Sequence, residues 1–67
     1  MMTKAEFEAA VAKCGLPCWV ELRNGDRVPC SSLVQVRVHI AVFESNDAQR
    51  LVRLSDIQSV GPAKGAT

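Results

Sequence analysis

The chain has 67 residues, with eight basic and seven acidic side chains and a formal net charge of +1. This length allows one small domain, and the near-neutral charge argues against both a disordered charged tail and a strongly cationic nucleic-acid-binding protein. The hydrophobic share of 48% is that of a globular chain, whose core is marginal at this size.

The N-terminal residues do not have the composition of a secretory signal, because Lys4 and Glu6 interrupt the apolar positions. The most apolar stretch, residues 33–43, contains Arg37 and His39 and is too short to span a membrane. We therefore expect a cytoplasmic protein without a membrane span.

A helix is predicted over residues 3–14. Thr3 and Glu6 have the spacing of a capping box, in which each side chain bonds the other residue's backbone N–H. Gly15 and Pro17 are typical of a helix end. Apolar side chains then follow one helical face: Phe7, Ala10, Val11 and Cys14.

From Cys18 the hydrophobic period changes to two, which predicts a strand with Cys18, Val20 and Leu22 on its inner face. Asn24-Gly25 is the pair that favours a type I′ hairpin turn. A returning strand is expected from about Asp26, and the proline at position 29 restricts that strand to a sheet edge or a bulge.

Residues 34–42 alternate without interruption and predict one long strand that bends between two sides of a sheet. Val38 should then be buried, so that Val38→Asp would unfold the chain. A turn is expected at residues 44–47, a strand at 49–54, and a short final strand with Ile57 and Val60 inward. Residues 61–67 are expected to form a flexible tail.

These elements predict a single domain over residues 1–60. Its class is mainly β, with an N-terminal helix followed by a five-stranded, strongly bent antiparallel barrel of the small Sm/SH3-like type. The predicted core is Phe7, Val11, Val20, Leu22, Val28, Val34, Val36, Val38, Ile40, Val42, Leu54 and Ile57.

Cys14, Cys18 and Cys30 could provide a tetrahedral zinc site together with His39. Their spacing lacks the close cysteine pair of common structural zinc sites, and free cysteines are often buried. We therefore interpret the three cysteines as structural thiols and predict neither a metal nor another cofactor.

No catalytic residues are predicted. His39 is the only histidine, and the chain has no glycine-rich phosphate loop and no paired carboxylate motif. The protein is therefore expected not to be an enzyme.

An outward polar surface is the main candidate site. Trp19, Glu21, Arg23, Arg37 and His39 occupy outward positions of the first and third predicted strands, and they form one surface if those strands are close. Tryptophan and arginine are enriched at interface hot spots. The alternative interpretation is that Trp19 packs beneath the helix.

Two segments resemble the Sm-like small barrels, a superfamily that includes the RNA chaperone Hfq and the Rho-binding antiterminator family Rof. Residues 20–28, with Asn24-Gly25 at their centre, are similar to the opening motif of those barrels. Residues 54–60 are similar to the closing motif. The helix-first order is closest to the Rof family, while the sequence Val52-Arg53-Leu54-Ser55 differs from the pore signature of Hfq.

This resemblance implies a small bacterial binding module that acts by protein–protein contact, as a transcription regulator that binds Rho or other transcription machinery in antitermination. The implied mode presents acidic side chains, and the acids nearest the first three strands are Glu21, Asp26, Glu44 and Asp47. RNA binding of the Sm-like kind is the alternative. A monomer or weak dimer is expected, because Pro29 and alternating arginines interrupt the strand edges. The predicted partner-binding residues are Trp19, Glu21, Arg23, Asp26, Arg37 and His39.

Overall fold

A computed structural model describes residues 2–63. One α-helix comes first, six strands follow, and a single 3-10 turn lies before the last strand. The elements in chain order are α1 (Lys4–Cys14), β1 (Cys18–Leu22), β2 (Arg27–Cys30), β3 (Ser32–Val36), β4 (Ile40–Ser45), β5 (Ala48–Arg53), η1 (Leu54–Asp56) and β6 (Ile57–Pro62).

The predicted helix is confirmed, with Thr3 as its N-cap. Glu6 donates its backbone N–H to Thr3 Oγ1 at 3.1 Å, and Thr3 donates its own to Glu6 Oε1 at 2.9 Å, so the capping box is complete. Gly15 ends the helix at a φ of 79°, where its N–H donates to the carbonyl of Val11 at 2.8 Å. Glycine adopts such a positive φ at little cost.

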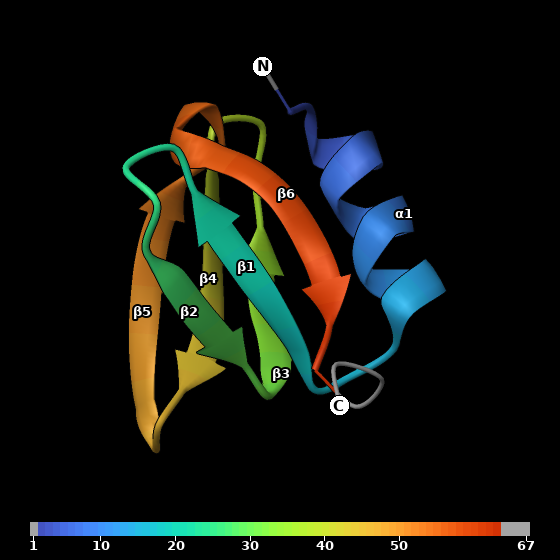
Figure 1. Cartoon of the computed structure of the whole chain (residues 1–67). Coiled ribbons are helices and arrows are strands. Elements are labelled where there is room, and N and C mark those ends of the chain that lie inside the picture. Colours follow the sequence, from blue (N-terminus) through green and yellow to red (C-terminus); the bar gives the residue numbers. More distant parts are fainter. Residues whose placement is uncertain (1, 64–67) are drawn as a thin grey trace.

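The strands form two antiparallel three-stranded sheets, ordered β2-β1-β6 and β3-β4-β5. Figure 1 shows the first sheet in front of the second, with α1 beside β6. The predicted class, mainly β after an N-terminal helix, is confirmed. The strand count and closure differ, because the structure has six strands in two sheets and no single closed barrel among residues 2–63.

The β1–β2 turn differs in type from the one predicted, and the turn predicted at residues 44–47 is present at residues 46–47. At the β1–β2 connection only Gly25 has a positive φ, 96°, and its N–H donates to the Leu22 carbonyl, so the turn is not of type I′. Asn46 and Asp47, between β4 and β5, have φ of 53° and 67°, as a two-residue type I′ turn requires. Pro29 lies on β2, which is an edge strand as predicted.

The prediction of one long strand at residues 34–42 is wrong. β3 ends at Val36 and β4 begins at Ile40, and the Arg37 N–H donates to the Ile40 carbonyl at 2.8 Å to close a tight turn. Beyond this turn the inward parity changes, so that Ala41 and Phe43 are fully buried. Val38, in the turn, is 71% exposed, which overturns the expectation that Val38→Asp unfolds the chain.

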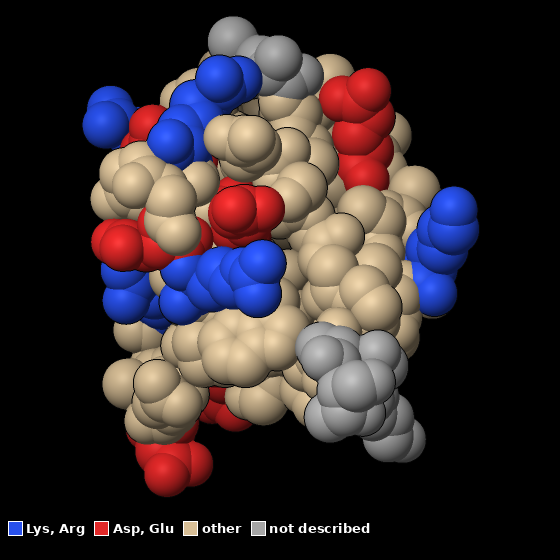
Figure 2. All heavy atoms as spheres, in the orientation of Figure 1, with Lys and Arg blue, Asp and Glu red and all other residues tan. Residues whose placement is uncertain are grey.

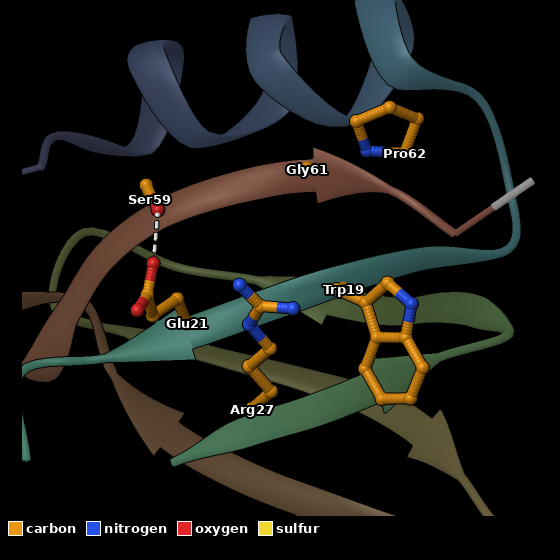
Figure 3. Close-up of a pocket in the computed structure, with 6 residues that line it drawn as sticks. All are labelled: Trp19, Glu21, Arg27, Ser59, Gly61 and Pro62. Atoms are coloured by element: carbon orange, nitrogen blue, oxygen red, sulfur yellow. Dashed lines mark hydrogen bonds between the residues drawn. The ribbon is translucent and has the colours of Figure 1, made fainter. Parts of the chain in front are cut away.

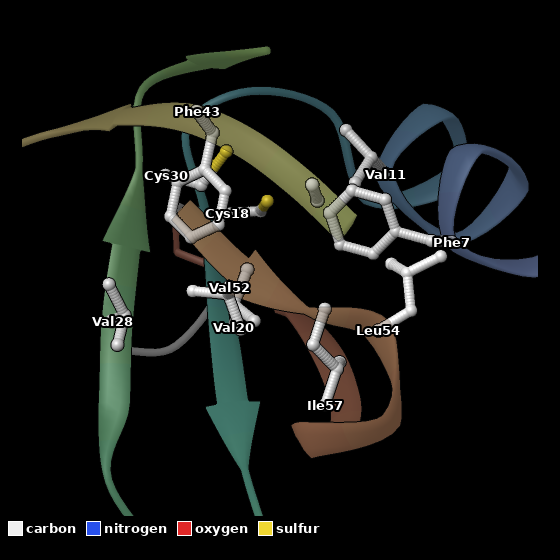
Figure 4. Packing of buried hydrophobic residues seen from close by; sticks show 11 residues of the cluster. Phe7, Val11, Cys18, Val20, Val28, Cys30, Phe43, Val52, Leu54 and Ile57 are labelled. Atoms are coloured by element: carbon white, nitrogen blue, oxygen red, sulfur yellow. The ribbon is translucent and has the colours of Figure 1, made fainter. Parts of the chain in front are cut away.

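The core lies between the two sheets, and α1 covers its open side with Phe7 and Val11 (Figure 4). Six of the predicted core residues are buried, and Leu22 and Val36 pack partly against them. Val34 and Val38 are exposed, and Ile40 and Val42 are only partly buried. The buried residues are Phe7, Val11, Cys18, Val20, Val28, Cys30, Ala41, Phe43, Val52, Leu54 and Ile57.

Strand β6 extends through Gly61 and Pro62, which the sequence placed in a tail. The last four residues of that predicted tail, 64–67, lie outside the described residues. Within residues 2–63, no helix has the length and apolar character needed to cross a membrane.

Candidate functional site

Trp19 and Glu21 lie on the outer face of the β2-β1-β6 sheet. Their neighbours Cys18 and Val20 are fully buried, and successive side chains of a strand point to opposite faces. The predicted outward direction of Trp19 is confirmed, and α1 packs over the core rather than over this side chain. The outer face therefore presents an aromatic side chain beside a carboxylate.

A shallow groove of about 230 Å³ lies on this face. We call it the Trp19 groove, and Figure 3 shows the six residues that line it: Trp19, Glu21, Arg27, Ser59, Gly61 and Pro62. The pairing of β1 with β6 explains the hollow, because Gly61 lies opposite Trp19 and has no side chain to fill the space. Pro62 adds a second apolar wall.

The charges of the Trp19 groove come from Glu21 and Arg27, which are cross-strand partners on β1 and β2. Figure 3 shows the Arg27 side chain between those of Glu21 and Trp19. Ser59 donates its hydroxyl to Glu21 Oε1 at 3.1 Å. Across residues 2–63, no carboxylate oxygen lies within 4.0 Å of the Arg27 guanidinium. Among residues 2–63, the groove thus contains a cation that no carboxylate neutralises.

The wider surface around this groove carries charges of both signs. Figure 2 shows basic and acidic side chains interspersed with uncharged area on the face that Figure 1 presents. A surface that attracts a phosphate backbone usually gathers basic residues on one face. The visible face does not have that character.

Arg23 and Asp26, two further predicted site residues, lie at the β1–β2 turn. Arg23 donates its Nε–H to the Ser55 carbonyl at 2.8 Å, which fixes the turn to η1. Asp26 receives a bond from Asn24 Nδ2 at 3.2 Å and donates its own N–H to Asn24 Oδ1. Arg23 also lines a second depression, of about 290 Å³, with Leu22, Asn24 and Asp56.

Arg37 and His39 are not brought together with Trp19. They lie in the turn between β3 and β4, whereas Trp19 belongs to β1 in the other sheet. The predicted joint surface required the first and third strands to be close on one face. The structure separates the six predicted residues into three places: the groove, the β1–β2 turn and the β3–β4 turn.

The cysteines lie at one end of the core. Cys18 and Cys30 are cross-strand partners and fully buried, and Cys14 is half-buried, with its thiol 3.7 Å from the Val60 carbonyl. Burial raises the pKa of Cys18 and raises that of Cys30 to about 12. In the part of the chain that the structure describes, no three His, Cys, Asp or Glu side chains lie close enough to hold a metal ion.

The predicted partner-binding set lacks four residues of the Trp19 groove: Arg27, Ser59, Gly61 and Pro62. The hairpin register could have indicated Arg27, because a strand returning from Asn24-Gly25 places it opposite Glu21. The other three residues lie on β6: Ser59, Gly61 and Pro62. This strand pairs with β1, from which it is far away in the sequence. No local pattern in the sequence reports that pairing.

Comparisons of the chain with protein-family models, with curated proteins and with solved structures find no match.

Proposed function

We propose that this chain is a small non-catalytic binding module that acts through protein–protein contact at the Trp19 groove. The observation that carries the proposal is the position of Arg27, a cation without a carboxylate partner among residues 2–63, beside the partly buried side chain of Trp19. Tryptophan and arginine are the side chains most enriched among residues that dominate binding energy.

The lining of the groove defines the chemistry of its occupant. Trp19 and Pro62 provide apolar surface, and the hollow at Gly61 has space for an inserted side chain. Arg27 offers a planar set of N–H donors that matches a carboxylate. A partner segment with an apolar side chain next to an aspartate or glutamate fits this lining: the apolar side chain contacts Trp19 and Pro62, and the carboxylate binds Arg27.

The finer proposal is a transcription regulator of the Rho-binding antiterminator type, and it rests on the resemblance of residues 20–28 and 54–60 to Sm-like barrels. That mode relies on acidic side chains. Of the four candidate acids, Glu21 lines the groove, Asp26 lies in the first hairpin turn, and Glu44 and Asp47 belong to the other sheet and its turn. The groove is therefore the favoured contact, with Glu21 as its acid.

RNA binding is the second candidate, because arginine suits phosphate contact. The arginines are distributed over both sheets. Three are already engaged within the chain: Arg23 with the Ser55 carbonyl, Arg53 with Asp56 and Arg37 with the side-chain amide of Gln35. This distribution favours a protein partner over a nucleic-acid backbone.

Fluorescence of Trp19, the single tryptophan, tests the finer proposal. The purified chain is titrated separately with Rho protein and with a single-stranded oligoribonucleotide. The Rho-type proposal expects a saturable emission change with Rho that Gly61→Leu abolishes. A change with the oligoribonucleotide alone, weakening steeply with salt, would support the RNA alternative instead. No response to either would refute the Rho assignment.

A further inference from the structure

The outer face of the β3-β4-β5 sheet carries apolar side chains that the sequence predicted to be inside. Leu51 on β5 is 60% exposed, and it pairs with Val42 on β4. On β3, the registered partner of Val42 is Gln35, and Val34, 48% exposed, precedes it in the register shift between Leu33 and Gln35. We call Val34, Val42 and Leu51 the outer apolar row, since they cross all three strands.

Val42 points outward because both of its neighbours on β4, Ala41 and Phe43, are fully buried. Ile40, two residues before Val42, extends the apolar surface along the same face of β4. Val38, in the adjacent turn, is 71% exposed. In a chain whose core is small, this amount of outward apolar surface calls for a partner.

Charges of opposite sign lie at the two ends of this face. Glu44, on β4, is on one side of the outer apolar row, and Asp47 is in the turn just beyond it. Arg53, opposite Ile40, is on the other side, and Arg37 is in the β3–β4 turn at that same end. The face thus has an acidic end and a basic end.

We propose that this face binds a second copy of the chain, with a two-fold axis that runs along the outer apolar row. Such an axis stacks the row of one copy on the row of the other and reverses the strand direction. The acidic end of each copy then meets the basic end of its partner. Glu44 of one copy lies diagonally across from Arg53 of the other.

A second copy fits because the charge pattern is complementary to itself. Arg53 is contacted by Asp56 only through Nε, at 3.3 Å, and its side chain remains 72% exposed, so its terminal N–H groups are free to reach a second carboxylate. Glu44 accepts one bond from Ser32 Oγ, at 3.4 Å, and has further acceptor capacity. Two such contacts arise from one symmetry operation.

The interface is small. The proposed interface buries about 500–600 Å² per copy, which is at the lower limit for specific association. The total surface of the chain is 4387 Å². The expected dimer is therefore weak and depends on concentration. The Trp19 groove lies on the opposite sheet and stays open in it.

Sedimentation equilibrium from about 1 µM to about 1 mM tests the proposal. The average mass should rise from 7.3 kDa toward twice that value. Leu51→Glu should weaken association at least about tenfold, because it places a charge in the stacked row. Leu16→Glu is the matched control, since Leu16 is 43% exposed in the α1–β1 connection, and it should leave association unchanged.

A charge-reversal pair tests the two-fold arrangement. Glu44→Arg alone and Arg53→Glu alone should each weaken the dimer, because each places like charges at both ends of the interface. The double variant should restore association. A chain that remains at 7.3 kDa throughout, a Leu51→Glu variant that associates normally, or a double variant that is not rescued would each overturn the proposal.

Discussion

Glu21 and Arg27 face each other across β1 and β2, yet the Glu21 carboxylate accepts its hydrogen bond from Ser59 on β6. The direct neighbours of opposite charge are therefore not an ion pair within 4.0 Å. Since exposed ion pairs contribute little stability, the fold does not depend on closing this one. Within residues 2–63 no carboxylate pairs with Arg27, which is why the Trp19 groove is the centre of the proposed function.

Filling the groove should leave the fold intact. A Cβ built on Gly61 meets no atom within 4 Å, and its φ is outside the positive region, so a side chain can begin at this position without a clash or backbone strain. In Gly61→Leu the leucine would cover part of Trp19, and the emission of that tryptophan should shift to the blue as its solvent exposure falls. Unchanged emission in a folded variant would show that the hollow beside Trp19 is not where the structure places it.

Two substitutions in the same region distinguish the observed turn from the long strand that the sequence predicted. Val38→Asp should change the free energy of unfolding by no more than about 0.5 kcal/mol, because Val38 is 71% exposed. Ala41→Asp should unfold the chain, because an unpaired carboxylate at this fully buried position costs several kcal/mol. Thermal unfolding followed by circular dichroism measures both. An unfolded Val38→Asp variant would restore the long-strand interpretation.

The reason for that difference is local. The alternation at residues 34–42 continues through a turn that contains no glycine, proline or asparagine, so nothing in the composition marks it. Before the turn, the even-numbered residue Val36 points toward the core, and after the turn, the odd-numbered residue Ala41 does. A shift of one residue exchanges the two faces of a strand, so Val42, which was expected in the core, points outward.

Local signals predicted other parts of the fold well. The capping box defined α1, and the alternation after Cys18 placed Trp19 on the outer face. For the candidate site, only Trp19 and Glu21 were found together in advance, because both belong to one strand. The groove also needs Gly61 from β6, and the pairing of β1 with β6 depends on the tertiary fold rather than on any nearby residue.

The N-terminal cap should contribute measurably to stability. Thr3→Ala removes the acceptor of the Glu6 N–H bond and should cost about 1 kcal/mol, or roughly 4–8 °C in Tm for a domain of this size. Thr3→Ser, which keeps the hydroxyl, should retain most of the stability. Equal melting temperatures for all three proteins would contradict the capping role.

The cysteines should differ in reactivity. Cys18 and Cys30 are fully buried and their pKa values are raised, so iodoacetamide at about pH 8 should modify Cys14 first. Intact mass spectrometry should show one alkylated position in the folded protein and three in denaturant. Rapid modification of Cys30 under native conditions would contradict its buried position.

The raised pKa values also predict a loss of stability at high pH. The Cys30 thiol holds its proton up to about pH 12 when folded but only to about pH 9 when unfolded, so the unfolded state binds fewer protons between these values. The free energy of unfolding should therefore fall as the pH rises above about 9. Denaturant titrations should show a weaker dependence for Cys30→Ala, and an unchanged dependence would argue against this cause.

The central claim, that the Trp19 groove binds a protein, is tested most directly by affinity capture from bacterial lysate with and without nuclease. Four baits are compared: the native chain, Trp19→Ala, Arg27→Glu and Arg37→Ala, the last being a control in the β3–β4 turn, outside the groove. We predict a protein that the native chain and Arg37→Ala retain after nuclease, and that both groove variants lose. Recovery of only nuclease-sensitive material, or of a protein that all four baits retain equally, would contradict the claim.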